Sequence, residues 1–123
     1  MDWYAPVTLN ELLDLRSTFP GNQSKLVFGN TRVQIERRYH QMQCSRLISI
    51  THIKELQECR RTDDFLIFGA GVTFAKLKTK LTEWNHDEYG FCQALLDQMK
   101  YFASTQIRNV ASLGGNIISA SPM

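Results

Sequence analysis

The chain has 123 residues, of which 43% are hydrophobic and 21% are charged, and its formal net charge is +2. This length predicts one domain around one core, and the composition excludes the disordered and collagen-like classes. Because 14 basic residues are nearly matched by 12 acidic ones, the charge gives no support to polyanion binding, and we expect no nucleic-acid partner.

The first predicted element is a helix over residues 9–18. Thr8 and Glu11 have the spacing of a capping box, in which the Thr8 hydroxyl caps the first turn and Glu11 reaches back to the Thr8 N–H. Pro20 and Gly21 then supply a stop and a turn.

Three extended segments are predicted next. The apolar run over residues 25–28 is typical of a short buried strand that ends before Gly29. Val33 and Ile35 predict a second extended piece, and residues 47–50 predict another short strand.

The second half contains the clearest strand, over residues 65–68. It is closed by residues 69–71, after which Thr73 is a suitable N-cap for a helix. Inward positions of that helix are Phe74, Leu77 and Leu81. A third helix is predicted over about residues 91–104, and its apolar stripe consists of Phe91, Leu95, Met99 and Phe102. Strands that alternate with helices predict an α/β arrangement.

The sequence also bounds the cellular setting. No apolar run approaches the ~18 residues of a transmembrane helix, so we expect no membrane partner. The start, residues 1–6, lacks the basic and apolar regions of a secretory signal. Cys44, Cys59 and Cys92 are odd in number and widely spaced, which fits neither a disulfide framework nor a zinc site. We therefore expect reduced thiols and a cytoplasmic protein.

Two glycine-bearing turns are the main functional signal. Gly29-Asn30-Thr31 follows one apolar run, and Ser112 to Asn116 includes the adjacent pair Gly114-Gly115. Glycine allows close approach of the backbone to an anion, and consecutive N–H groups can form an anion-binding concavity. The pair predicts two loops that face one phosphate-containing ligand, although a tight turn without a ligand remains the alternative for each.

Other chemical motifs are absent from the sequence. Gly69 and Gly71 match the start of the dinucleotide fingerprint, but Phe74 stands in place of its third glycine, and no P-loop occurs. The three histidines, His40, His52 and His86, lack metal-ligand spacing, and no serine elbow is found. No catalytic or metal-binding residue is assigned. Phe102 is expected either to contact a planar ring or to pack in the core.

Three segments resemble the FAD-binding domain of the xanthine dehydrogenase and aldehyde oxidase family. They are Leu26-Val27-Phe28-Gly29-Asn30-Thr31, Phe68-Gly69-Ala70-Gly71-Val72-Thr73, and the long run from Gln106 through Ser112-Leu113-Gly114-Gly115-Asn116 to Ser121-Pro122. Their order and approximate spacing agree with the family, and the resemblance extends over nearly the whole chain.

The resemblance implies the PCMH-type flavoprotein fold, in which an α/β subdomain and an α+β subdomain hold FAD between them. Residues 1–123 would be a partial domain, namely the first subdomain and the start of the second. By matching position, the residues that would wrap the FAD diphosphate are Leu26, Val27, Phe28, Gly29, Asn30, Thr31, Arg32 and Val33. Those that would close over it are Ser112, Leu113, Gly114, Gly115 and Asn116, and Phe102 matches a cofactor-contacting position.

Two departures from the family pattern stand in the first loop: Arg32 replaces an acidic or small polar residue, and Gln34 replaces a glycine. The family continues past Pro122, so we expect a truncated module. The complete enzymes, which generally work as dimers, also contain iron-sulfur clusters and a molybdenum cofactor, and pass electrons through FAD to NAD or oxygen. The alternative is a non-catalytic fragment or interaction module that binds no flavin by itself.

Overall fold

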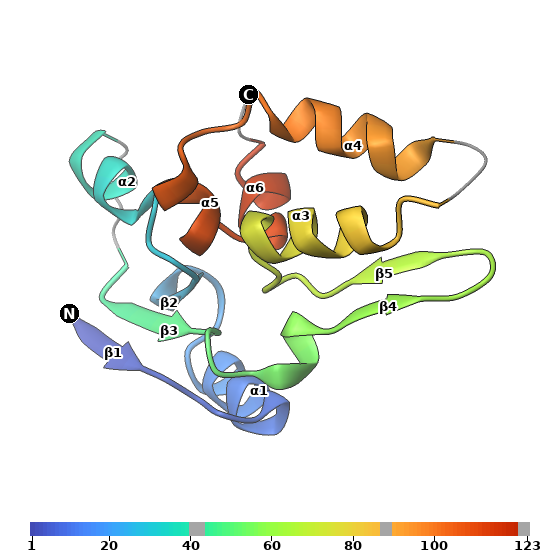
Figure 1. The fold of residues 1–123 in the computed structure, drawn as a ribbon. Coiled ribbons are helices and arrows are strands. Elements are labelled where there is room, and N and C mark those ends of the chain that lie inside the picture. The colour runs from blue at the N-terminus through green and yellow to red at the C-terminus, as the bar shows by residue number, and fades with distance from the viewer. Residues whose placement is uncertain (40–43, 87–89, 121–123) are drawn as a thin grey trace.

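The structure is a computed structural model that describes residues 1–39, 44–86 and 90–120, and it combines helices with two small sheets (Figure 1). No helix among these residues is long and apolar enough to cross a membrane. The strands are β1 (Asp2–Tyr4), β2 (Ser24–Val27), β3 (Arg46–Ser49), β4 (Cys59–Arg61) and β5 (Leu66–Phe68). The α-helices are α1 (Leu9–Thr18), α2 (Val33–Tyr39), α3 (Phe74–Glu83), α4 (Phe91–Met99), α5 (Thr105–Val110) and α6 (Leu113–Ile118), and 3-10 turns occupy Gly21–Gln23 and Lys54–Gln57.

The N-terminal half is a three-stranded parallel sheet with the order β1-β3-β2. Helix α1 covers it, and Leu12 packs with Ile48 and Ile53 in a small core. The predicted helix over residues 9–18 is confirmed together with its capping box. The strands predicted at residues 25–28 and 47–50 are confirmed within one residue, whereas β1 was not predicted.

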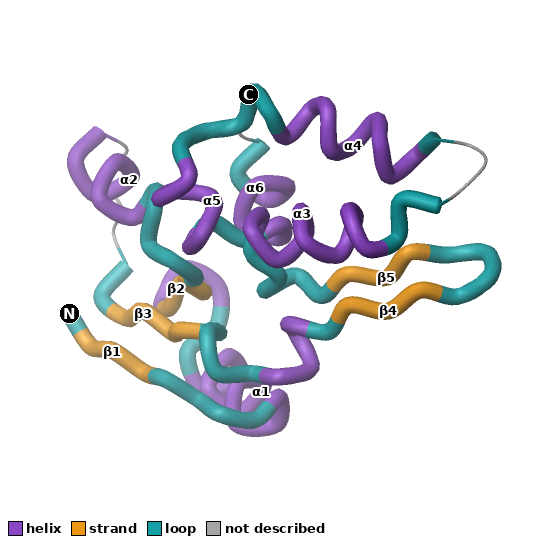
Figure 2. The backbone as a smooth tube through the Cα atoms, viewed as in Figure 1, coloured by secondary structure: helices purple, strands orange, loops and turns teal. Residues whose placement is uncertain are grey.

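The second half packs two helices beside an antiparallel hairpin. Strands β4 and β5 form the hairpin, and helices α3 and α4 lie together next to it (Figure 2). Thr73 caps α3, and the expected inward residues Phe74, Leu77 and Leu81 are buried, so this prediction is confirmed. Strand β5 confirms the strand predicted at residues 65–68, whereas β4 was not predicted.

The two halves meet along the backbone that follows β5. The Gly69 N–H donates to the Glu58 carbonyl at 2.8 Å, and the Gly71 N–H donates to the Leu56 carbonyl at 2.7 Å. A Cβ atom at position 69 would overlap the Leu56 carbonyl group. These glycines therefore close the strand, as the sequence predicted, and they also pack it against the 3-10 turn at Lys54–Gln57, which was not predicted.

Two predicted elements are wrong in part. The extended piece expected at Val33 and Ile35 is the start of helix α2, and Ile35 is exposed, so the apolar alternation does not correspond to one buried face of a strand. The helix expected over residues 91–104 ends at Met99. Phe91, the first residue of the helix after the left-handed N-cap Gly90, is 55% exposed and does not join the buried stripe.

Candidate cofactor-binding site

A cavity of about 630 Å³ lies between the segment that follows β2 and the helices α5 and α6. The predicted site residues that line it are Leu26, Val27, Phe28, Thr31, Arg32, Val33, Phe102, Ser112, Gly115 and Asn116. The predicted residues Gly29, Asn30, Leu113 and Gly114 are not in its wall, although each is adjacent in sequence to a wall residue. The structure thus brings together two segments that are about eighty residues apart in the chain.

Gly29 shapes the first of these segments. Its φ is +63°, and a Cβ atom there would lie 2.7 Å from the carbonyl carbon of Val110. Asn30 also has a positive φ, of 54°, which asparagine tolerates better than most residues. The chain therefore turns sharply at the end of β2 and packs its bare backbone on α5.

The N–H groups of Gly29 and Asn30 make no hydrogen bond to another residue that the structure describes. Successive unpaired backbone N–H groups in a turn attract anions. Thr31, next in the chain, lines the cavity with its hydroxyl unbonded within the described ranges. In the described part of the chain, the turn at residues 29–31 thus has the unbonded N–H groups that the sequence predicted for it, together with an unbonded hydroxyl group.

The second segment differs from its prediction, because Gly114 and Gly115 lie in the first turn of helix α6 and not in a loop. The Ser112 hydroxyl caps this helix by accepting from the Gly115 N–H at 3.1 Å. The Gly114 N–H donates to the Ala70 carbonyl at 2.9 Å. The expected bare N–H groups of both glycines are thus already bonded within the chain.

Docking of α6 explains why two poor helix formers lie in a helix. The Leu113 N–H donates to Val72 and the Phe74 N–H to Ala111, so residues 70–74 pair with residues 111–114. Each glycine costs a helix about 1 kcal/mol relative to alanine. The cap and the paired backbone offset that cost, and a Cβ atom at position 114 would lie 2.8 Å from atoms of Ala70.

Phe102 belongs to both the core and the cavity wall. Its ring packs on Phe74 with centroids 4.2 Å apart, and it joins the larger hydrophobic cluster. The same residue lines the cavity. The predicted core packing is confirmed, while contact with a planar ring stays a prediction.

Several wall residues were missed by sequence reasoning: Lys25, Glu36, Tyr101, Ala103, Ile107, Ala111 and Ile118. Ser119, a possible further hydroxyl donor from the sequence, also lines the cavity, and its hydroxyl donates to the Asn116 carbonyl at 3.2 Å. Lys25 and Glu36 form an ion pair across the wall, from β2 to α2. No local pattern connects two residues on different elements. Ile107 and Ala111, in contrast, have the i, i+4 spacing of one helical face. A helix predicted at residues 105–110 would therefore have placed these two residues side by side.

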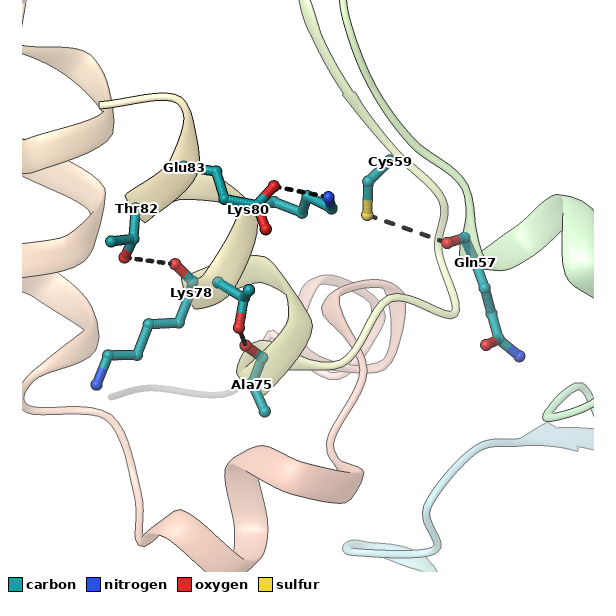
Figure 3. Close-up of polar contacts among 8 residues, drawn as sticks. Gln57, Cys59, Ala75, Lys78, Lys80, Thr82 and Glu83 are labelled. Carbon is teal, nitrogen blue, oxygen red and sulfur yellow. Dashed lines mark hydrogen bonds and ion pairs between the residues drawn. The ribbon is translucent and has the colours of Figure 1, made fainter. Parts of the chain in front are cut away.

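Cys59 on β4 faces polar side chains of α3, and its thiol lies 4.0 Å from the Gln57 carbonyl oxygen (Figure 3). Partial burial raises the pKa of the Cys59 thiol above its ordinary value, while the positive charges of Lys76 and Lys80 act in the opposite direction. Lys80 extends toward Cys59 and pairs with Glu83 at 2.7 Å, whereas Lys78 points away from the thiol. Cys44, Cys59 and Cys92 form no disulfide.

The remaining candidates show no chemical centre. His52 and His86 are exposed, and no group of three metal-ligating side chains occurs within residues 1–39, 44–86 and 90–120. His40, Ser121 and Pro122 lie outside the described residues.

Comparison with known sequences identifies relatives over the whole chain. The profile of the family described as "FAD binding domain in molybdopterin dehydrogenase" matches residues 1–123. Xanthine dehydrogenase of Oryza sativa subsp. japonica is 41% identical over 125 residues, and xanthine dehydrogenase/oxidase of Gallus gallus is 39% identical over 125 residues. Both alignments cover 98% of this chain but only 9% of the relative, so the chain spans a small part of these enzymes.

Solved structures show the same fold. Quinoline 2-oxidoreductase from Pseudomonas putida 86 superposes with a TM-score of 0.81 at 21% identity, covering 95% of this chain and 39% of that chain. A carbon monoxide dehydrogenase from Hydrogenophaga pseudoflava gives a TM-score of 0.76 at 24% identity, with the same two coverages. At these identities the likeness concerns architecture alone. With the profile match over its full length, the chain belongs to the family of FAD-binding domains of molybdopterin dehydrogenases.

Proposed function

We propose that this chain forms one wall of the FAD site of a molybdenum-dependent oxidoreductase of the xanthine dehydrogenase or aldehyde oxidase type. Residues 1–123 would be part of that FAD domain, its first subdomain with the start of the second. The observation that carries the proposal is the cavity, which joins residues from the Leu26–Val33 segment, the Ser112–Asn116 segment and Phe102 in one wall.

The residues of the cavity suit a dinucleotide cofactor. Its volume of about 630 Å³ lies within the ~300–1,000 Å³ of typical ligand pockets. Leu26, Phe102 and Ile107 give it apolar surface for ring systems. The free N–H groups at Gly29 and Asn30 border it and suit a diphosphate, which is anionic.

Each part of the wall would then have a role in binding. The turn at Gly29 and Asn30 and the Thr31 hydroxyl would donate to phosphate oxygens. Ser112 and Gly115 would hold the opposite wall, since helix α6 is fixed to residues 70–74. FAD supplies the redox chemistry when bound, and the protein positions it and sets its electrostatic surroundings. No side chain of this cavity is assigned an acid, base or nucleophile role.

In the parent enzyme, purines or aldehydes would be oxidised at a molybdenum cofactor in another domain, and electrons would pass from iron-sulfur clusters through FAD to NAD or oxygen. We also propose that this enzyme is located in the cytoplasm. A homodimer is the proposed assembly of the complete enzyme.

A second candidate is an interaction module that binds no flavin by itself. Two apolar wall residues favour it, because Tyr101 is 84% exposed and Ile118 is 89% exposed. Such surface is typical of sites that associate with another protein surface. In this case the wall would become a binding site only when further protein covers it.

Visible absorbance after incubation with FAD and removal of free cofactor distinguishes the two candidates. We expect a retained flavin spectrum near stoichiometry, and loss of part of it in Gly114→Val, whose side chain would push α6 away from Ala70. Circular dichroism of both proteins checks that each is folded. A folded chain that retains no flavin favours the interaction module.

A further inference from the structure

The cavity wall contains more positive than negative side chains. Three charged residues line it, namely Lys25, Arg32 and Glu36. Lys25 and Glu36 neutralise each other as an ion pair. Arg32 has no ion pair with any residue of the described ranges, so the wall carries one uncompensated positive charge.

Arg32 also differs from the other half-buried arginines of the described chain. The Arg16 guanidinium donates to the Ser24 carbonyl at 2.9 Å, and that of Arg108 donates to the Phe102 carbonyl at 2.7 Å. Arg46 pairs with Asp2 and stacks over the Phe19 ring. Structural arginines in this fold are thus held by contacts within the chain.

No contact of this kind holds Arg32. Its Nε is buried and has no hydrogen-bond acceptor among the described residues, and the Nε of Arg46 shares this property, but Arg46 is held by Asp2 and Phe19 whereas Arg32 has no such contact. A buried donor without a partner is unfavourable, and a guanidinium without internal bonds is free to adjust its position toward a ligand. The residue lines a cavity whose preceding turn also offers the unbonded N–H groups of Gly29 and Asn30. Arg32 in the wall and the turn that precedes it in the chain thus both carry donors without a partner among the described residues.

We propose that Arg32 is the residue that makes this cavity selective for ligands with a diphosphate. A guanidinium donates two parallel hydrogen bonds to phosphate oxygens, and such charge-assisted bonds are stronger than neutral ones. The inference rests on the proposed function, since FAD is the dinucleotide concerned. It adds a charge-based selection that Lys25 cannot supply, because Lys25 is already paired.

The test compares Arg32→Gln with Arg37→Gln in the 123-residue chain. Arg37 lies in α2, five residues after Arg32. It is exposed and does not line the cavity, so the control removes one positive charge at a position outside the site. Flavin fluorescence titrations would use FAD and riboflavin, which lacks phosphate. For Arg32→Gln we expect FAD binding to weaken by about tenfold, with less dependence on salt, and riboflavin binding to stay unchanged. For Arg37→Gln neither ligand should bind differently.

A second measurement separates this inference from the proposed function. The Arg32 Nε–Hε resonance of the unaltered chain is followed by NMR as ADP or adenosine is added. A shift with ADP and none with adenosine supports the inference, even if FAD itself is not retained. FAD binding that is equal in the unaltered chain and in Arg32→Gln overturns the inference while leaving the proposed function intact. Absence of both FAD binding and an ADP-dependent shift overturns both.

Discussion

Gly29 packs directly on the backbone of Val110, so closely that a Cβ atom at position 29 would lie 2.7 Å from the Val110 carbonyl carbon. The contact joins the end of β2 to the end of α5, which are far apart in the sequence but form adjacent sides of the cavity. The width of the proposed flavin site therefore depends on one position that has no side chain.

Replacing Gly29 with alanine should destabilise the fold by about 3 kcal/mol. The alanine would have to adopt a left-handed backbone conformation and would also overlap Val110, and each effect costs on the order of 1–3 kcal/mol. Urea unfolding of both proteins measures the change.

The matched control is Gly21→Ala. Gly21 has a similar φ of +58°, but nothing lies within 4 Å of an added Cβ atom. We expect a loss of about 1–2 kcal/mol from the backbone strain alone. Equal losses at the two positions would show that the Val110 contact has no energetic weight.

Ser112→Ala should lower both stability and flavin affinity. The Ser112 hydroxyl caps α6, and losing such a cap costs about 1 kcal/mol. Ser104 caps α5 with the same geometry but does not line the cavity. Thermal unfolding should therefore respond to either substitution, whereas FAD titration should respond to Ser112→Ala alone.

Phe102→Leu and Phe74→Leu test the two roles of Phe102 separately. Both substitutions remove the same aromatic pair, worth about 1 kcal/mol beyond buried area, so similar decreases in melting temperature are expected. Only Phe102 lines the cavity. A several-fold weaker FAD affinity should follow from Phe102→Leu, and an equal effect from Phe74→Leu would assign Phe102 to the core alone.

The Cys59 thiol should titrate at a higher pH than an ordinary cysteine, since partial burial raises its pKa. Because the folded-state pKa is raised, the contribution of the neutral thiol to stability is fully present below the pKa of the unfolded chain and is lost as the pH rises through the raised pKa. Lys80→Gln should raise the pKa further by removing a cation that lowers it.

Lys78→Gln provides the comparison, because Lys78 lies on the same helix and points away from Cys59 (Figure 3). The measurement uses a chain in which Cys44 is replaced by serine and Cys92 by alanine, so that Cys59 is the only thiol. The rate of thiolate alkylation as a function of pH then gives the pKa of Cys59. A pKa that shifts equally in both lysine variants would point to net charge and not to proximity.

Local signals in the sequence predicted several elements correctly. The capping box at Thr8 and the N-cap at Thr73 located the starts of α1 and α3, because each depends only on residues within one helical turn. Short apolar runs located β2, β3 and β5. These features require no knowledge of distant parts of the chain.

Elements that depend on distant contacts were predicted poorly. The adjacent glycines at 114 and 115 suggested a loop, but the Ser112 cap and the hydrogen bonds to residues 70–72 support a helix in this segment. The ion pair between Lys25 and Glu36 likewise needs the turn between β2 and α2 to be known. Recognition of the family motifs, in contrast, named most of the cavity wall without any geometry.

Three glycines, at positions 29, 69 and 114, each place bare backbone against another segment, at Val110, Leu56 and Ala70 respectively. A core leucine can be exchanged for isoleucine or methionine at small cost, but no side chain enters these three contacts unless the backbone moves. Substitutions at these three positions should therefore be harder to accommodate than exchanges between core hydrophobic residues. We therefore expect these three glycines and their spacing to identify remote members of the family better than the pattern of hydrophobic residues does.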